Sequence, residues 1–345
     1  LDEVPQHLKG VTCYFCHTVD AVEGTHNNPL RLAGGRVLRA GLSDPVANGA
    51  HPTAYSDLHD SNSAASSDLC GSCHDIELND FHLEQTFVEW QESVFDVEPF
   101  TLSCSECHMP GSDDVVADFD GVPLRRRHSH SWPGVDTALI DWPGKDVQEA
   151  LILEELRTSV QSQLCYNPDG NKLELNLTNI AAGHMFPSGA TQDRRVWAEI
   201  VATVGDNEIL SSGVIDEQQD IDKVEDELLW RLYDKGLGTD GELAHMFWDI
   251  VAKEGELLPP AVTFDIADPA YDHSVTRDYP LGGNPRPDRV EAVVKMRQIS
   301  LGLIDDLIDS GDLDPAFRER IKTFELSGSR IVWTPELAGS DLCVP

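Results

Sequence analysis

One short pattern, Cys-x-x-Cys-His, carries most of the recognisable chemistry of this 345-residue sequence and occurs three times, at residues 13–17, 70–74 and 104–108. Its members are the cysteines Cys13, Cys16, Cys70, Cys73, Cys104 and Cys107 and the histidines His17, His74 and His108. Positions three or four apart share one face of a helical turn, so both thiols of a copy can reach the two vinyl groups of one porphyrin. The histidine that follows then supplies a proximal iron ligand. The pattern predicts three covalently attached c-type haems.

Other uses of paired cysteines fit this pattern less well. A structural zinc site takes four ligands around one tetrahedral ion, and three pairs that each end in histidine are an awkward number for it. Closely spaced pairs do not staple a chain of this length as disulfides. A thioredoxin-like redox motif would follow a strand, and no strand pattern precedes any of the three copies.

Each haem iron has a second axial position, for which histidine is the predicted ligand. His51 and His59 lie shortly before the second copy of the pattern, and His128 and His130 follow the third. In an extended segment the side chains of His128 and His130 would point to the same side, so they could serve neighbouring haems, or one could ligate while the other stays free. The arginines at 125–127 directly precede them and would clamp haem propionates or an acidic neighbouring subunit, with a solvated loop as an equal alternative.

The remaining axial candidates are weaker. His184 follows Gly183, which permits close backbone approach, but a structural histidine in a loop is equally favoured there. Further candidates for the second axial position, with less support, are His7, His26 and His82. Methionine ligation is disfavoured because Met109 adjoins His108 and cannot reach the opposite face of that iron. Bis-histidine ligation of all three irons would leave none open to a substrate.

The charge balance excludes one large class of function. The chain carries 61 acidic and 25 basic residues, a formal net charge of −36. Such a surface repels nucleic acid, so we expect no nucleic-acid partner. No apolar run reaches the 18 or so residues that a membrane span requires. The chain begins at Leu1 rather than at methionine, which is consistent with a removed signal peptide.

Two cysteines remain outside the pattern, Cys165 and Cys343. An oxidising compartment would allow them to form a disulfide that ties the end of the chain to the start of its second half. Two free buried thiols are the less favoured alternative.

The second half of the sequence shows regular periodicity. Residues 146–149 resemble a capping box and predict a helix that runs to about residue 165. Leu173, Leu175 and Leu177 alternate with polar residues and predict a strand with one buried face. Further strands are predicted at 195–204, 208–210, 289–299 and 330–333, and helices at 300–310 and from residue 314.

These patterns predict an α+β chain of two domains. Residues 1–145 form a loop-rich tri-haem cytochrome c domain that packs around its porphyrins, with short helices at the three copies of the pattern and at 83–93 and a loop at 61–67. Residues 146–345 form a haem-free, antiparallel β-sandwich-like domain with helical insertions, which would serve assembly or partner contact.

Several segments resemble the multihaem cytochromes c of bacteria and archaea. They are residues 10–20 (GVTCYFCHTVD), 69–75 (LCGSCHD), 89–93 (EWQES) and 104–110 (CSECHMP). Residues 179–189 (NIAAGHMFPSG), followed by 194–197 (RRVW), are similar to a Gly-His-x-x-Pro-Thr-Gly element in the haem-free C-terminal domain of that family, with Ser188 in place of the threonine. The resemblance covers nearly the whole chain. It implies haem attachment outside the cytoplasm, and some members with this layout form extracellular haem-stacked filaments.

The leading interpretation is therefore an electron-transfer protein, periplasmic or extracellular. It would be the subunit of a haem-chain homopolymer that exchanges electrons with redox partner proteins or extracellular acceptors. A multihaem oxidoreductase would need an open iron, and the sequence has no Cys-x-x-Cys-Lys variant to indicate one. A monomeric periplasmic carrier, or a subunit of a respiratory complex, is the other alternative.

Overall fold

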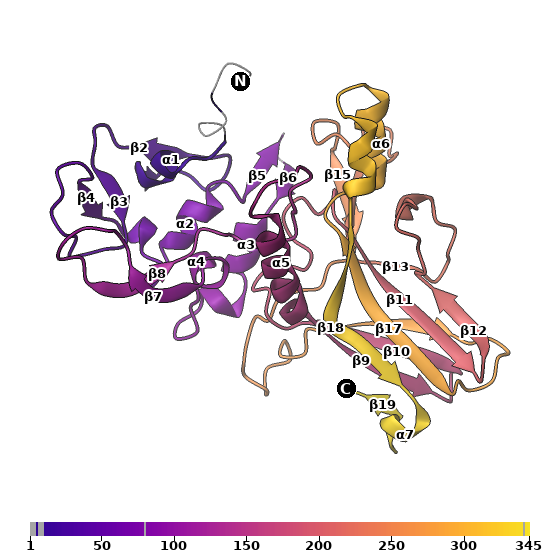
Figure 1. Ribbon diagram of the computed structural model, residues 1–345. Coiled ribbons are helices and arrows are strands. Elements are labelled where there is room, and N and C mark those ends of the chain that lie inside the picture. The colour runs from indigo at the N-terminus through magenta and orange to yellow at the C-terminus, as the bar shows by residue number, and fades with distance from the viewer. Residues whose placement is uncertain (1–4, 6–9, 79–80, 341) are drawn as a thin grey trace. The chain divides into compact units, whose positions relative to one another are not determined.

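The computed structural model describes residues 5, 10–78, 81–340 and 342–345 (Figure 1). The chain forms two compact units, Leu1–Trp132 and Pro133–Pro345. The division lies before the expected break at residue 145, because residues 133–144 pack with the second unit. Val135 is buried in its main apolar cluster, and Thr137 is hydrogen-bonded to Gln298 through both its amide and its hydroxyl.

The second unit contains two antiparallel sheets that face each other. One has the strand order β16 (Val275–Pro280), β10 (Lys172–Asn179), β9 (Val160–Asn167) and β19 (Cys343–Val344). The other has the order β12 (Asn207–Ser212), β11 (Arg195–Val204), β17 (Arg289–Arg297) and β18 (Thr323–Trp333), and β13 (Trp230–Arg231) also pairs with β11. Figure 1 shows the strands of the two sheets stacked as layers. The chain is thus α+β, as expected.

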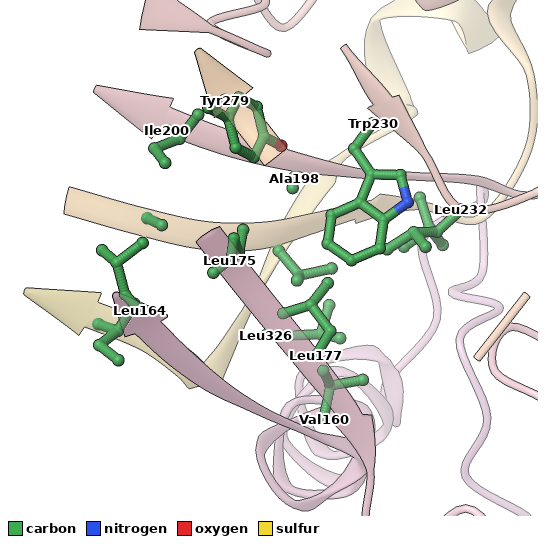
Figure 2. Close-up of a cluster of buried hydrophobic side chains, with 14 of the residues drawn as sticks. Val160, Leu164, Leu175, Leu177, Ala198, Ile200, Trp230, Leu232, Tyr279 and Leu326 are labelled. Atoms are coloured by element: carbon green, nitrogen blue, oxygen red, sulfur yellow. The ribbon is translucent and has the colours of Figure 1, made fainter. Parts of the chain in front are cut away.

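The core of this unit fills the space between the two sheets. Leu175 and Leu177 on β10 alternate with polar residues, and both are essentially inaccessible to solvent. They belong to the same apolar cluster as Ala198 and Ile200 on β11 and Trp230 on β13 (Figure 2). The period-two pattern therefore places one face of each sheet against the other, the arrangement of a β-sandwich.

Helical segments and a smaller hairpin complete the second unit. They are α5 (Lys145–Ser159), η4 (Ile221–Lys223), α6 (Leu301–Asp309), η5 (Pro315–Arg320), α7 (Pro335–Ala338) and the hairpin β14 (Asp234–Leu237) and β15 (Ala252–Gly255). The expected helix from residue 314 is a 3-10 helix, whose N-terminus is capped by the Asp314 side chain.

Two predicted elements of this unit have different limits. The helix expected to reach residue 165 ends at Ser159, and β9 follows it directly. Val160, Ser162 and Leu164 are buried while Gln161 and Gln163 are exposed, so the alternation of a strand prevails over the helix-like spacing. The predicted capping box is also not formed.

The last strand is longer than predicted. β18 begins at Thr323, well before residue 330, and its register with β17 shifts between Ala292 and Val294. The hydroxyl of Ser329 accepts the amide hydrogen bond of Val294 at this irregularity. Gly328 and Ser329 interrupt the alternation of apolar and polar residues, so the sequence pattern did not predict the first half of the strand.

The first unit consists of short elements. They are α1 (Cys13–His17), β1 (Val19–Val22), β2 (Leu30–Leu32), β3 (Leu38–Ala40), β4 (Thr53–Tyr55), η2 (Asp57–His59), α2 (Ser66–Gly71), β5 (Ile76–Leu78), β6 (Phe81–Glu84), α3 (Thr86–Gln91), η3 (Val94–Asp96), α4 (Cys104–His108), β7 (Gly111–Val115) and β8 (Leu124–His128). Among the described residues of this unit, consecutive strands pair as four two-stranded sheets, of which only β3–β4 is parallel. The helix predicted at 83–93 is shorter, because residues 81–84 form β6.

Buried apolar side chains are scarce in the first unit. Among its described residues they are Val19, Leu83, Phe87, Trp90 and Val94, and the larger apolar clusters of the described chain lie in the second unit. In the part of the chain that the structure describes, no helix is both long enough and apolar enough to cross a bilayer.

Cys165 and Cys343 form a disulfide, which confirms their predicted pairing. They face each other across β9 and β19, so the bond holds the short final strand on its sheet. It closes a loop of 178 residues.

Removing this disulfide will destabilise the second unit. In the chain-entropy model a loop of this length contributes about 5 kcal/mol. Urea denaturation of the Cys165→Ser/Cys343→Ser double variant, followed by circular dichroism, should show a lower midpoint than the parent protein. An unchanged midpoint would contradict the predicted role of the bond. Adding reductant to the parent provides the matched control, and it should lower the midpoint as the double substitution does.

Candidate functional site

The first Cys-x-x-Cys-His copy lies on the one-turn helix α1. The hydroxyl of Thr12 caps this helix by accepting a hydrogen bond from the Phe15 amide. His17 at its end donates from Nδ1 to the carbonyl oxygen of Arg39 on β3, at 2.6 Å. A metal-binding histidine is commonly held in this way, with one ring nitrogen on a carbonyl or carboxylate and the other on the metal. The geometry therefore prepares His17 to bind iron through Nε2.

A cavity of about 610 Å³ lies beside this helix and is lined by both Cys13 and His17. Its volume falls within the range of cofactor sites. The apolar part of its wall includes Leu38, Leu42, Val46, Val116, Phe119 and Val122. A thiol, an imidazole and an apolar wall around one space are the groups that a porphyrin requires, so the residues fit a c-type haem.

Two arginines supply the positive charge of this cavity, Arg39 and Arg125. Arg125 pairs with Asp44 at 2.6 Å and lowers the pKa of that carboxyl group. Its Nε atom is buried and has no hydrogen-bond partner among the described residues. A carboxylate that entered the cavity would satisfy this donor, so Arg125 fits a propionate-binding role. The neighbouring Arg127 instead forms an ion pair with Asp114.

Three of the candidate axial histidines lie close to His17. Its ring centre is 5.6 Å from that of His59 and 6.2 Å from that of His130. Rings at these separations lie near enough for a metal between them to be held by both. His51 lines the same cavity as His17.

The environments of these histidines differ. Both ring nitrogens of His59 are engaged, with the Ser56 hydroxyl at 3.0 Å and the Cys16 carbonyl oxygen at 2.9 Å. Burial lowers the pKa of His59 and of His130. This shift favours the neutral imidazole, which is the form that binds iron.

The second copy of the pattern begins on α2, which ends at Gly71. His74 donates from Nδ1 to Oε1 of Glu84, at 2.9 Å, and this bond raises the pKa of His74. The carbonyl oxygen of His74 accepts the Phe87 amide hydrogen bond from α3, at 3.1 Å. Gly71 lies directly against the Phe87 ring, where a Cβ would overlap the ring carbons. The segment that follows the second copy therefore wraps back around it.

The third copy occupies α4, whose first turn has a complete capping box between Ser103 and Glu106. His128 lies beside it and donates from Nδ1 to the carbonyl oxygen of Met109, at 2.8 Å. The Ser61 hydroxyl is 2.6 Å from the other ring nitrogen of His128. The two histidines thus lie beside different copies of the pattern, because the His130 ring lies near that of His17.

The three copies of the pattern converge through α2. Buried serines join this helix to α4, since the hydroxyls of Ser66 and Ser105 are 3.0 Å apart and Ser67 accepts the amide hydrogen bond of Cys104. The neighbouring Cys104 thiol, together with burial, raises the pKa of Cys70.

The first copy meets the same helix. The Asn28 amide donates to the carbonyl oxygen of Ser72 at 2.6 Å, and Cys16 lies close enough to Cys73 for the two thiols to interact electrostatically. Cysteines of the second copy therefore adjoin cysteines of both other copies.

The remaining candidates lie elsewhere. His184 belongs to the second unit, where its Nδ1 donates to the Met185 carbonyl oxygen, so its role as a ligand stays a prediction. His26 and His82 have ring centres 6.5 Å apart, and His82 pairs with Asp75 directly after the second copy. His7 lies outside the described residues.

Glu84 is a residue that the sequence did not single out. It lies ten positions after His74. The turn-forming residues between the two could have predicted a hairpin, and a hairpin would bring Glu84 back beside His74.

Comparison with known proteins assigns the fold. No family model and no curated protein matches the chain. A solved structure does: the crystal structure of a penta-heme cytochrome c552 from Thermochromatium tepidum, at a TM-score of 0.57 and 16% sequence identity. The match covers 96% of this chain and 78% of that one. The chain therefore shares the fold of a multihaem c-type cytochrome.

Replacing Gly71 with alanine will test the packing around the second copy. Alanine is the better helix former by about 1 kcal/mol, but its Cβ would overlap the Phe87 ring. We expect a net destabilisation of about 1–3 kcal/mol, as for other overpacked sites. Chemical denaturation of the haem-loaded protein measures it. The control is Gly49→Ala, since a Cβ there meets nothing within 4 Å. Equal stability of the two variants would contradict the packing argument.

Proposed function

We propose that this chain is a tri-haem c-type cytochrome that carries electrons outside the cytoplasm. The observation that best supports this function is the cavity beside α1, where Cys13 and a His17 already oriented through Nδ1 meet an apolar wall. Two further copies of the same residues adjoin it, and the fold is similar to that of a multihaem cytochrome.

Attachment requires only the residues of the pattern and the porphyrin. Each thiol adds across one haem vinyl group, so that the sulfur bonds to one vinyl carbon and the hydrogen passes to the other. The addition consumes no oxidant and leaves six thioethers in place of the six thiols of the pattern. When bound, a haem supplies an iron that accepts and releases one electron.

His17, His74 and His108 would be the proximal ligands. His51, His59 and His130 are the candidates for the second ligand of the first haem, because all three approach His17 or its cavity. His128 is the nearest corresponding candidate at the third copy, and His184 stays a candidate without an assigned haem. Such a ligand set lets the chain pass single electrons between an external donor and an external acceptor while the irons stay closed to substrates.

Mass measurement of the denatured protein will test the proposal. We expect a mass increase of three haems that persists under denaturing and reducing conditions, because thioether bonds survive both. The dithionite-reduced native protein should not bind carbon monoxide if every iron has two histidine ligands. A haem-free mass would refute the cytochrome function. Carbon monoxide binding at one haem would instead favour an enzyme with an open iron.

We also propose that the protein assembles into an extracellular haem-chain filament. The resemblance to filament-forming cytochromes supports this, as does a second unit that contains no attachment pattern and leaves a whole sandwich for contact with a neighbour. Subunits with a formal net charge of −36 repel one another, so their association would depend on screening by salt. A repeated head-to-tail contact that does not close would produce a filament.

Negative-stain electron microscopy of the extracellular fraction, in high and in low salt, will test this assembly. We expect filaments at high salt that dissociate as the salt is lowered. Mass spectrometry of the purified filaments identifies the subunit. Discrete particles under both conditions would exclude the polymer and favour a monomeric carrier.

A further inference from the structure

The proximal histidines of the first two copies differ in the group that holds their second nitrogen. Nδ1 of His17 donates to the carbonyl oxygen of Arg39, which is a neutral acceptor. Nδ1 of His74 donates to the side-chain carboxylate of Glu84. The first histidine would therefore bind iron with a neutral group behind its ring, and the second with a charged one.

The fold places Glu84 beside His74 through a short hairpin. β5 begins two residues after His74, and β6 returns antiparallel to it, with Glu84 opposite Ile76. The Glu84 side chain is only 14% exposed, and the Phe87 amide binds the His74 carbonyl oxygen on the far side of the same segment. Both the backbone and the ring of His74 are thus fixed by residues 84–87.

A carboxylate acceptor changes what the imidazole offers to a metal. A hydrogen bond to an ionised acceptor is roughly twice as strong as one to a neutral acceptor. It draws the Nδ1 proton toward the oxygen and makes the imidazole a more basic ligand. A more basic axial ligand stabilises ferric over ferrous iron, so it lowers the reduction potential.

We infer that Glu84 is a positioning residue that holds the haem of the second copy at a lower potential than the haem of the first. This inference rests on the proposed function, since it requires a haem at each copy. Glu84 acts through His74 and has no predicted contact with the iron.

Potentiometric titration of the loaded, full-length Glu84→Gln variant will test the inference. Glutamine keeps the size of the side chain and removes its charge. We expect one of the three potentials to rise, by about a tenfold change in the reduction equilibrium, which is 59 mV for one electron. The other two potentials should not change. The potential that rises should not be the highest of the three in the parent protein.

Glu92→Gln is the matched control. Glu92 is exposed at the C-terminal end of α3, so this change removes the same charge from the same unit without touching His74. An equal shift of the potential in both variants would mean that loss of any nearby negative charge is sufficient, and it would overturn the inference. Three unchanged potentials in Glu84→Gln would also overturn it.

Haem content separates this inference from the proposed function. The mass of each variant is measured first, and a parent protein without covalent haem would refute the cytochrome function itself. If Glu84→Gln does not retain three haems, Glu84→Asp is titrated in its place. Its shorter side chain keeps the charge but lengthens the contact with His74, so the same single potential should rise by a smaller amount. A fully loaded Glu84→Asp variant with parental potentials would overturn the role of Glu84.

Discussion

The first unit depends on one constraint: it has too few apolar side chains to build a core from protein alone. Five are buried among its described residues, while the second unit contains an apolar cluster that spans two sheets. The secondary structure of the first unit is correspondingly slight, with one-turn helices and two-stranded sheets. Isolated elements of this size are marginal in water. A large apolar cofactor bonded to the ends of such helices would supply the surface that they lack.

This constraint accounts for the way the attachment helices are placed. α2 lies between its neighbours, joined to α4 by buried serine hydroxyls and to the segment after β1 by backbone hydrogen bonds. Small side chains allow close approach of these helices. The order of the sites then follows from the packing of the helices, with the second site adjoining both others. If the middle site has a lower potential than the first, an electron that passes from the first site to the middle one moves to a less readily reduced position.

The sequence predicted the parts of this molecule that have strong local patterns. The first and third attachment patterns lie on short helices as predicted, and the second begins on one. The alternation of Leu173, Leu175 and Leu177 and the two remaining cysteines led to the observed strand and disulfide. The first and last residues of helices and strands were harder to predict from the sequence. Val160 fits a helical spacing as well as a strand, and only its pairing with Asn179 across the sheet decides the matter.

The environment of each site could not be predicted in the same way, because it depends on contacts between distant segments. His128 and His130 are two residues apart, yet one lies beside Met109 and the other beside His17. The Glu84 carboxylate reaches His74 only once a hairpin has formed. Periodicity carries no information on such contacts, so the sequence gives the candidates and the tertiary structure decides which of them meet.

The neighbouring thiols of Cys70 and Cys104 have a consequence for how the protein is made. The bond between Cys165 and Cys343 across β9 and β19 requires an oxidant to form. If haems attach at these cysteines, as proposed, a chain that folds before attachment would expose a second pair of neighbouring thiols to the same oxidant. Oxidation of that pair would consume two thiols from different attachment sites and leave neither site able to complete its thioethers. Under the proposed function, thioether formation at these two sites would therefore have to precede oxidation of the Cys70 and Cys104 thiols.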